Sequence, residues 1–307
     1  MRVAVTGATG FIGRHLVTSL LARGDSVTAL TRDPVHARGL LGDHVECVAW
    51  SPEEPTGVWR GALSNANAVV HLAGEPIANR RWNPAIKKRI LDSRVLGTRH
   101  LVDAIAKGGH RPGVFVCASG SDFYGADAGE RELDETSPRG AGFLSDVCVA
   151  WESEAARAAE WGVREVRLRT GVVLGDSGGA LEKMSGPFRW FIGGPVGSGM
   201  QWVPWIAIDD LVAIVLLAID RDSVRGPINV VGPAPVRMRE FAKALGAAMG
   251  RPSWFRVPSF AVKLAAGDVA DSVVGSKRMV SRILAREGFV WRVNSVHDAM
   301  KRAVGTE

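Results

Sequence analysis

Apolar stretches of strand length alternate with longer amphipathic stretches along the first half of the chain. The strand-length stretches cover residues 2–6, 26–31, 45–49, 68–73, 114–118 and 163–169. The helical stretches cover residues 11–23, 84–107 and 143–161. This alternation predicts a parallel sheet with helices on both faces, and the strand stretches are apolar throughout, as burial on both faces requires. We therefore expect the α/β class, with a Rossmann-type doubly wound parallel sheet.

The pattern changes after Leu174. Glycine and proline recur there and interrupt any regular element, which predicts loops. A helix is expected from Asp209 to Ile219, because two carboxylates suit a helix N-terminus, followed by a strand over 228–231 and then short helices. We expect two domains: an N-terminal dinucleotide-binding domain over 1–230, which includes substrate-side loops over 175–208, and a small, mostly helical C-terminal domain over 231–307.

Composition narrows the classes of protein that fit. The chain has 307 residues, 46% of them hydrophobic, and can bury a full core. It shows neither a signal-like leader nor an apolar run of the roughly 18 residues that a membrane span needs, so we expect a soluble, cytoplasmic protein. The net charge of +6 comes from scattered Lys and Arg and predicts a solvated basic surface rather than nucleic-acid binding. Cys47, Cys117 and Cys148 lack Cys-x-x-Cys spacing, so no disulfide framework and no metal site is expected.

Three glycines lie between the first expected strand and the first expected helix. Gly7 permits a tight turn, Gly10 lets a diphosphate approach the backbone, and Gly13 lets the helix pack on the strand. Backbone N–H groups and the helix dipole meet an anion at such a turn. Because a strand precedes and a helix follows, dinucleotide binding is favoured over a merely structural turn. The expected contacts in this loop are Gly7, Thr9, Gly10, Phe11, Ile12 and Gly13.

The end of the second strand indicates which dinucleotide binds. NAD enzymes of this architecture carry an acidic residue there for the ribose 2′-hydroxyl, but here the strand ends in Thr31 and Arg32. A guanidinium matches a 2′-phosphate, and Thr31 adds a hydroxyl. The alternative is that Arg32 pairs with Asp33 as a surface salt bridge. We expect NADP(H) rather than NAD(H).

Further motifs carry a family resemblance. Thr6–Gly13, His71–Gly74, Cys117–Ser119 with Tyr124–Gly125, and Trp205–Asp210 together resemble the extended short-chain dehydrogenase/reductases. More narrowly, the chain resembles atypical, NAD-dependent epimerase-like proteins with a C-terminal domain of unknown function. That likeness lies in Leu72–Ile77, Arg81–Asn83, Ser93–Arg94, Phe143–Glu152, Gly178–Leu181 and the region from Trp254 through Phe289, and it covers nearly the whole chain. The resemblance implies further cofactor contacts at Leu72, Ala73, Gly74, Glu75, Arg94, Ala118 and Val173.

The catalytic pattern of the resembled family is broken in this sequence. Extended members use Tyr-x-x-x-Lys, in which the Tyr exchanges a proton with the substrate and the Lys lowers the pKa of the Tyr. Tyr124 is the only tyrosine, and Ala128 stands four places after it. Counted from Glu152, the Tyr and Lys positions fall on Leu144 and Cys148, neither of which replaces the pair. The family's Asn on the preceding helix is also changed, to Arg94.

Two charged residues near the end of the fourth strand have alternative roles. Arg94 is expected to reach the cofactor ribose or phosphate and partly replace the lost Lys, or else to be an exposed helix arginine. Glu75 could serve as an acid, as a substrate contact, or as an ion-pair partner of Arg80, Arg81 or Arg94. The ion pair is favoured, because a carboxylate amid arginines is held ionised and is a poor proton donor.

Several polar and aromatic residues remain as candidates. Ser119 could hydrogen-bond a substrate carbonyl or form a turn. Tyr124 could act as a displaced general acid, but with no neighbouring cation expected its pKa should stay near about 10, and a packed loop aromatic is favoured. Cys148 is expected to be a small buried side chain rather than a reactive thiol. Among the tryptophans, only Trp202 and Trp205 suggest a substrate contact.

Two functional hypotheses follow. The leading one is an NADP(H)-dependent oxidoreductase or epimerase-like enzyme acting on a small carbonyl or nucleotide-sugar-like substrate, with water, Ser119 or Tyr124 as the proton source. The alternative is a catalytically silent NADP(H)-binding redox sensor or regulator. A small-molecule substrate is the expected partner, no nucleic acid or membrane is expected, and a homodimer is left open.

Overall fold

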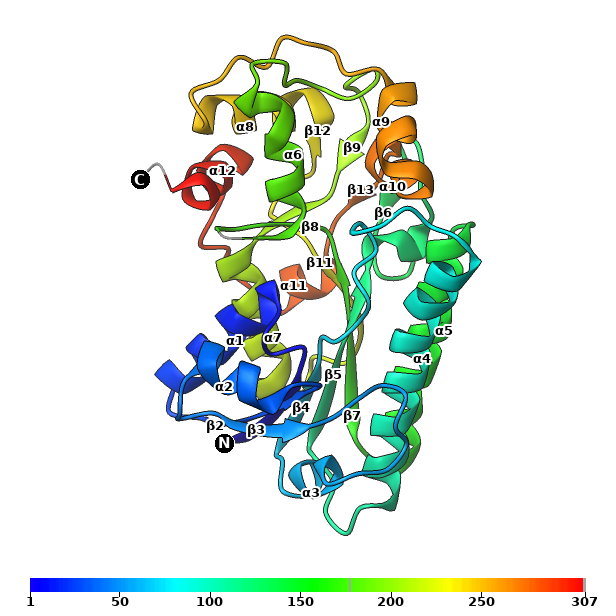
Figure 1. Cartoon of the computed structure of the whole chain (residues 1–307), viewed down its shortest axis with the longest axis vertical. Helices are drawn as coiled ribbons and strands as arrows, with labels where there is room; N and C mark the ends of the chain where they lie inside the picture. The colour runs from blue at the N-terminus through cyan, green and yellow to red at the C-terminus, as the bar shows by residue number, and fades with distance from the viewer. Residues whose placement is uncertain (177, 306–307) are drawn as a thin grey trace.

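The computed structural model describes residues 1–176 and 178–305 and is built around a seven-stranded sheet (Figure 1). Every neighbouring pair in this sheet is parallel. In spatial order its strands are β11 (Gly226–Val230), β7 (Arg164–Thr170), β5 (Val114–Gly120), β4 (Ala68–His71), β1 (Arg2–Thr6), β2 (Ser26–Thr31) and β3 (Glu46–Ala49). The order reverses between β1 and β4, and ligands of open α/β sheets bind at the carboxyl ends of strands at such a switch point. The expected Rossmann-type sheet is confirmed.

Helices cover both faces of the sheet, and two apolar cores fill the space between the layers (Figure 1). The first core holds α1 (Phe11–Ala22) and α7 (Ile208–Asp220) against one face. The second core holds α3 (Trp59–Ser64), α4 (Pro84–Lys107) and α5 (Phe143–Ala156) against the other. The segment expected to form one helix over 143–161 is an α-helix as far as Ala156 and a 3-10 helix, η2, over Arg157–Trp161. The remaining helix of this half is α2 (Pro34–Leu41), which follows β2.

A third apolar core lies beyond the carboxyl ends of the strands, in the upper part of Figure 1. Phe188, Trp205, Phe241 and Met300 are among its buried side chains. The elements that supply it are α6 (Gly179–Arg189), α8 (Met238–Ala248), α12 (Val296–Val304), β8 (Val172–Leu174), β9 (Trp202–Val203), β10 (Trp205–Ala207) and β12 (Val236–Arg237). The molecule therefore has a second lobe over the end of the sheet where ligands are expected.

The expectation that residues 175–208 contain no regular element is wrong. Helix α6 occupies 179–189, and its Leu181, Ser185 and Phe188 are buried at helical spacing. The helix accommodates Pro187, and Gly193 folds back so closely that a Cβ there would lie 2.3 Å from the Phe188 ring. Packing of this apolar face thus outweighs the local preference of glycine and proline to break a helix.

The C-terminal region is joined to the first lobe by its own strands and helices. Its further elements are α9 (Ser259–Ala266), η3 (Gly267–Val269), α10 (Ala270–Val274), β13 (Arg278–Met279) and α11 (Arg282–Arg286), and the first lobe adds η1 (Ser121–Tyr124) and β6 (Glu132–Leu133). Strand β13 pairs with β6, and Leu284 of α11 lies in the same core as the sheet. The boundary at residue 230 stays a prediction. Among the described residues, no helix has the length and apolar character that a bilayer crossing requires.

Asp210 ties this C-terminal region to the sheet. Its side chain is buried in α7, and its two oxygens accept hydrogen bonds from the backbone N–H groups of Arg292 (2.8 Å) and Val293 (3.1 Å). We expect Asp210→Ala to lower the free energy of unfolding by roughly 2–4 kcal/mol, because one buried and one part-buried N–H group lose their acceptors. Denaturant unfolding measures this change.

The matched control is Asp209→Ala. The Asp209 side chain is half exposed and lies 3.6 Å from Arg302, so its removal should cost less than about 0.5 kcal/mol. Equal losses in the two variants would contradict the role given to Asp210.

Candidate functional site

The turn between β1 and α1 is shaped by backbone contacts that exclude side chains. Gly7 has a φ of +69°, and a Cβ there would lie 2.9 Å from the backbone N of Ala73. A Cβ on Gly13 would lie 2.1 Å from the carbonyl oxygen of Gly7. A Cβ on Gly10 would contact only Gly7 O, at 3.2 Å. The three glycines thus have the geometry expected of them: a positive φ, an open approach and a close helix contact.

The N-terminus of α1 offers a site for an anion. Gly10 caps the helix in extended conformation without a side-chain hydrogen bond, and no acidic residue lies in the first turn. The first N–H groups of an α-helix have no intrahelical partner, and the helix dipole adds positive potential there. The groups at Phe11, Ile12 and Gly13 can therefore receive a diphosphate, as helix N-termini do for phosphates.

The glycine-rich loop before α6 packs against this turn. Cβ atoms built on Gly178 and Gly179 would lie 3.3 and 3.1 Å from the Phe11 ring, and His15 lies 3.5 Å from Asp176. Phe11 thus supports the loop as well as beginning the helix. The loop between the lobes borders the anion site.

At the end of β2 the salt bridge between Arg32 and Asp33 is absent among the described residues. Asp33 instead caps α2, since its Oδ1 accepts from the backbone N–H of His36 at 2.9 Å. Arg32 is exposed and forms no ion pair with the described part of the chain. Thr31 is half-buried, and its Oγ1 accepts from the N–H of Asp33 at 3.4 Å. The Arg32 guanidinium is therefore available to a ligand.

Thr6 holds the ends of β1 and β4 together. Its Oγ1 accepts from the N–H of Ala73 (3.3 Å) and lies 2.6 Å from Nδ1 of His71. Burial, together with the nearby charge of Arg94, lowers the pKa of His71 to about 3. The ring is neutral at physiological pH and shares a hydrogen bond with the Thr6 hydroxyl. This contact fixes Leu72 and Ala73 beside the glycine loop.

Arg94 is neither an exposed helix arginine nor a partner of the Glu75 carboxylate. Its Nη1 donates to the carbonyl oxygens of Glu75 (3.0 Å) and Ile90 (3.1 Å), and its guanidinium lies 5.1 Å from the Trp151 ring centre. A Cβ on Gly74 would lie 3.1 Å from its Cζ, so this position leaves room for the cation. Burial lowers the pKa of Arg94, which nevertheless stays charged in proteins.

The ion pair expected of Glu75 is present, but its partner is Arg89, which was not among the expected arginines. Oε1 of Glu75 lies 2.9 Å from Nη2 of Arg89, in the second turn of α4. The expected partners were Arg80, Arg81 and Arg94. Arg89 lies close because the first turns of α4, which begins at Pro84, pass the segment that follows β4, a path that sequence spacing alone does not reveal.

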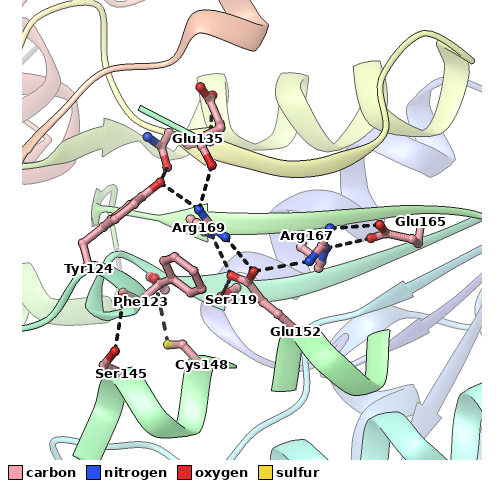
Figure 2. Close-up of polar contacts among 12 residues, drawn as sticks. Ser119, Phe123, Tyr124, Glu135, Ser145, Cys148, Glu152, Glu165, Arg167 and Arg169 are labelled. Carbon is pink, nitrogen blue, oxygen red and sulfur yellow. Dashed lines mark hydrogen bonds and ion pairs between the residues drawn. The ribbon is translucent and has the colours of Figure 1, made fainter. Parts of the chain in front are cut away.

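Ser119 belongs to a buried polar network, which Figure 2 shows as side chains from three elements pointing toward one another. Its hydroxyl donates to Oε1 of Glu152 at 2.7 Å. Nε and Nη2 of Arg169 donate to the two oxygens of the same carboxylate, each at 2.9 Å. All three residues are buried. The Ser119 proton is therefore held by Glu152 inside the protein.

Tyr124 lies on the other side of Arg169 in this network (Figure 2). Nη1 of Arg169 donates to the Tyr124 oxygen at 3.0 Å, and the tyrosine hydroxyl lies 2.7 Å from Oδ1 of Asn229. Burial raises the pKa of Tyr124 to about 12, although Arg169 acts to lower it. The expected pKa near 10 and the expected lack of a neighbouring cation were both wrong. The structure places Tyr124 in the interior, as a packed loop aromatic.

The positions of the lost Tyr-x-x-x-Lys pair carry no replacement acid. Leu144 is half-buried on α5, and the buried Cys148 thiol donates to the carbonyl oxygen of Gly120 at 3.9 Å. Burial, followed by the charges of Asp122 and Glu152, raises the pKa of Cys148 to about 12. The thiol therefore stays protonated at neutral pH, as expected of a small buried side chain.

The two suspected tryptophans differ. Trp205 is buried in the third core and donates to the carbonyl oxygen of Ala234. The Trp202 ring lies 3.7 Å from Cζ of Arg237, and its Nε1 donates to Glu130 at 2.9 Å. Ala118, near the end of β5, and Val173, in β8, are half-buried. These three half-buried residues remain candidates for ligand contact.

Arg169 is the main group of this network that was not predicted from the sequence. A signal was present. Arg164, Arg167 and Arg169 interrupt a strand that was expected to be buried on both faces, and buried charges need partners. Their partners lie far away in sequence, so the pattern shows the need for a network without showing its members.

The buried pair of Arg169 and Glu152 yields a test. We expect Arg169→Met to lower the free energy of unfolding by about 3–5 kcal/mol, because the buried Glu152 loses both hydrogen bonds from its main partner and keeps only the longer ion pair with Arg167, at 3.6 Å. Adding Glu152→Leu should recover much of that loss, since an apolar pair can replace a buried ion pair at little cost. A double-mutant cycle by denaturant unfolding measures the coupling. Additive losses would show that the two residues do not interact.

Comparisons with known proteins agree with this geometry. The model of the NAD dependent epimerase/dehydratase family matches residues 3–232, and a domain of unknown function, DUF1731, matches residues 257–303. An Arabidopsis thaliana protein named epimerase family protein SDR39U1 homolog, chloroplastic, is 40% identical over 98% of this chain and 86% of its own length. The mouse epimerase family protein SDR39U1 is 38% identical, covering 99% of this chain and all of its own.

Solved structures show the same relationship. Human epimerase family protein SDR39U1 (isoform 2), crystallised with NADPH, aligns with a TM-score of 0.86 and 34% identity over the full length of both chains. A nucleoside-diphosphate sugar epimerase from Corynebacterium glutamicum aligns with a TM-score of 0.80 and 32% identity, over all of this chain and 59% of that one. The expected family resemblance is confirmed. The chain belongs to the NAD dependent epimerase/dehydratase family, as a member that carries the DUF1731 region near its C-terminus.

Proposed function

We propose that this chain is an NADP(H)-binding atypical short-chain dehydrogenase/reductase that acts as an oxidoreductase or epimerase-like enzyme on a small carbonyl or nucleotide-sugar-like substrate. The observation that carries the proposal is the pairing of two features at one sheet edge. The first is the glycine turn with the uncapped N-terminus of α1, and the second is Arg32 at the end of β2, which is exposed and has no ion-pair partner in residues 1–176 and 178–305. The NADPH in the human relative's crystal structure supports this reading.

The residues present fit such a cofactor. The N–H groups at the start of α1 would hold the diphosphate, and Arg32 with Thr31 would hold the 2′-phosphate. The turn requires glycine at positions 7 and 13, because a Cβ on Gly7 or Gly13 would clash with the backbone. Leu72 to Gly74, Ala118 and Val173 lie at the neighbouring strand ends, where the rest of a dinucleotide runs in this fold. When bound, a nicotinamide cofactor supplies or accepts hydride.

Arg94 would provide the positive charge that the lost Lys gives elsewhere. Its guanidinium is fixed by the carbonyl oxygens of Glu75 and Ile90, and its charge acts on Cys148, which stands at the Lys position. Ser119 and Tyr124 stay predictions as proton donors. Their contacts support a structural role, because both hydroxyls are engaged inside the protein.

A second candidate is a catalytically silent NADP(H)-binding sensor, favoured by those engaged hydroxyls and by the missing Tyr and Lys. A panel of carbonyl compounds and nucleotide sugars, followed by NADPH absorbance, separates the two functions. Turnover supports the enzyme. NADPH binding with no turnover across the panel supports the sensor. The cytoplasmic location and the homodimer stay predictions.

Arg32 provides the test of cofactor choice. We expect wild type to bind NADPH more tightly than NADH, and Arg32→Ala to weaken NADPH binding about 10- to 100-fold, because a charge-assisted contact to a phosphate is worth roughly 1.5–3 kcal/mol. NADH binding should stay the same, since NADH has no 2′-phosphate. Calorimetric titration measures both affinities.

Arg38→Ala is the control, because Arg38 is an exposed arginine on the neighbouring α2 and should leave both affinities unchanged. Equal affinity of wild type for NADPH and NADH would overturn the assignment of Arg32. No binding of either dinucleotide would remove the proposed function itself.

A further inference from the structure

Asp122 is a carboxylate at the same sheet edge, and the C-terminal region holds it. It lies in the 3-10 helix η1 (Ser121–Tyr124), directly after β5. Nζ of Lys277 donates to its Oδ1 at 2.7 Å, and the Ser272 hydroxyl donates to the same oxygen at 2.9 Å. The Lys277 side chain is only 4% exposed. A nearly enclosed ion pair thus joins residues 155 positions apart.

The other carboxylate oxygen of Asp122 is left open. Oδ2 accepts no hydrogen bond from residues 1–176 or 178–305, since both contacts go to Oδ1. Oδ2 is not among the fully enclosed polar atoms without a hydrogen bond, and 17% of the Asp122 side chain is exposed. Asp122 therefore presents one anchored oxygen and one accessible oxygen.

Asp122 lies beside the positions where the usual catalytic pair is missing. A Cβ on Gly120 would lie 3.7 Å from Sγ of Cys148 and 3.8 Å from the backbone N of Asp122, so the start of η1 and the lost Lys position meet there. The charge of Asp122 also reaches this point: after burial, it is the next cause of the raised pKa of Cys148. It acts on Arg94 as well.

Stability alone does not explain this pair. An enclosed ion pair recovers little more than the cost of removing both charges from water, and an apolar pair of similar size often does as well. A purely structural tie would also gain from satisfying both carboxylate oxygens. Here Lys277 and Ser272 fix one oxygen and leave the other at the carboxyl end of β5, where ligands bind in this fold.

We propose that Asp122 is a catalytic residue that takes the proton of a substrate hydroxyl at Oδ2, and that Lys277 is a positioning residue that holds Asp122 through Oδ1. This assignment rests on the proposed oxidoreductase function. The substrate class is a secondary alcohol and its carbonyl product. The hydroxyl proton moves to Oδ2 while the hydrogen on the same carbon leaves with its electron pair to the oxidised nicotinamide, and the alcohol becomes a carbonyl. In the reverse direction, the protonated carboxyl returns the proton to the carbonyl oxygen.

The test compares Asp122→Asn and Lys277→Met with two matched controls. Asp146→Asn and Lys263→Met change an exposed aspartate and an exposed lysine that form ion pairs elsewhere. The NADP⁺ affinity, measured by calorimetry, should be unchanged in all four variants, because Asp122 faces the substrate. Turnover of a panel of secondary alcohols, followed by NADPH formation, should fall about 10²- to 10⁴-fold in Asp122→Asn, the usual range for loss of a general base. Lys277→Met should lower kcat more than it raises KM, and the controls should match wild type.

Chemical rescue separates a catalytic role from a structural one. Formate should restore turnover to Asp122→Ala, because it supplies a carboxylate to the emptied space, and ethylammonium should restore it to Lys277→Ala. Neither salt should raise the activity of wild type. Asp122→Asn keeps the size and the acceptor of the side chain, so it remains decisive if thermal unfolding shows that a Lys277 variant does not fold.

Turnover that persists in Asp122→Asn, or Asp122→Ala that formate does not restore, overturns the role of Asp122 and leaves the proposed function standing. A wild type that binds NADP⁺ but oxidises no alcohol and reduces no carbonyl in the panel overturns the enzymatic function, and this assignment with it.

Discussion

The candidate site depends on a backbone contact that leaves no room for a side chain. The turn from β1 to α1 presses Gly13 onto the carbonyl oxygen of Gly7, and Gly7 onto the end of β4 at Ala73. A side chain at either glycine would push the first helix away from the sheet or separate the two central strands. The same turn directs the first N–H groups of α1 beyond the sheet edge. Core packing and anion binding therefore arise from one constraint.

Around that turn, the polar groups divide into an inward set and an outward set. Glu152 and Arg169 are costly to bury, and they are tolerated because each charge is met by several hydrogen bonds. This network engages the hydroxyls of Ser119 and Tyr124 in hydrogen bonds inside the protein (Figure 2). Arg32 and one oxygen of Asp122 remain directed outward. The chemistry available to a ligand is thus set by which groups the interior leaves unpaired.

Sequence reasoning succeeded where the signal was local. The strand–helix alternation and the glycine turn depend on residues close together in the chain, and the sheet follows from them. It failed where packing between distant segments decides the outcome. Helix α6 forms despite its glycines because Leu181 and Phe188 find an apolar core. The pKa of Tyr124 rises because the fold buries it beside Arg169 and Asn229. Neither neighbour can be identified from spacing.

Close packing between distant segments also connects the C-terminal region to the first lobe. Gly275 approaches Ala126 so tightly that a Cβ there would overlap the Ala126 carbonyl oxygen, at 1.8 Å. One residue later, the carbonyl oxygen of Ser276 accepts from Ala128, and β13 then pairs with β6. These contacts fix the segment that follows β5 against the C-terminal region. They also bring Lys277 to Asp122, so a region that contributes little to the sheet itself determines how the sheet edge presents its charge.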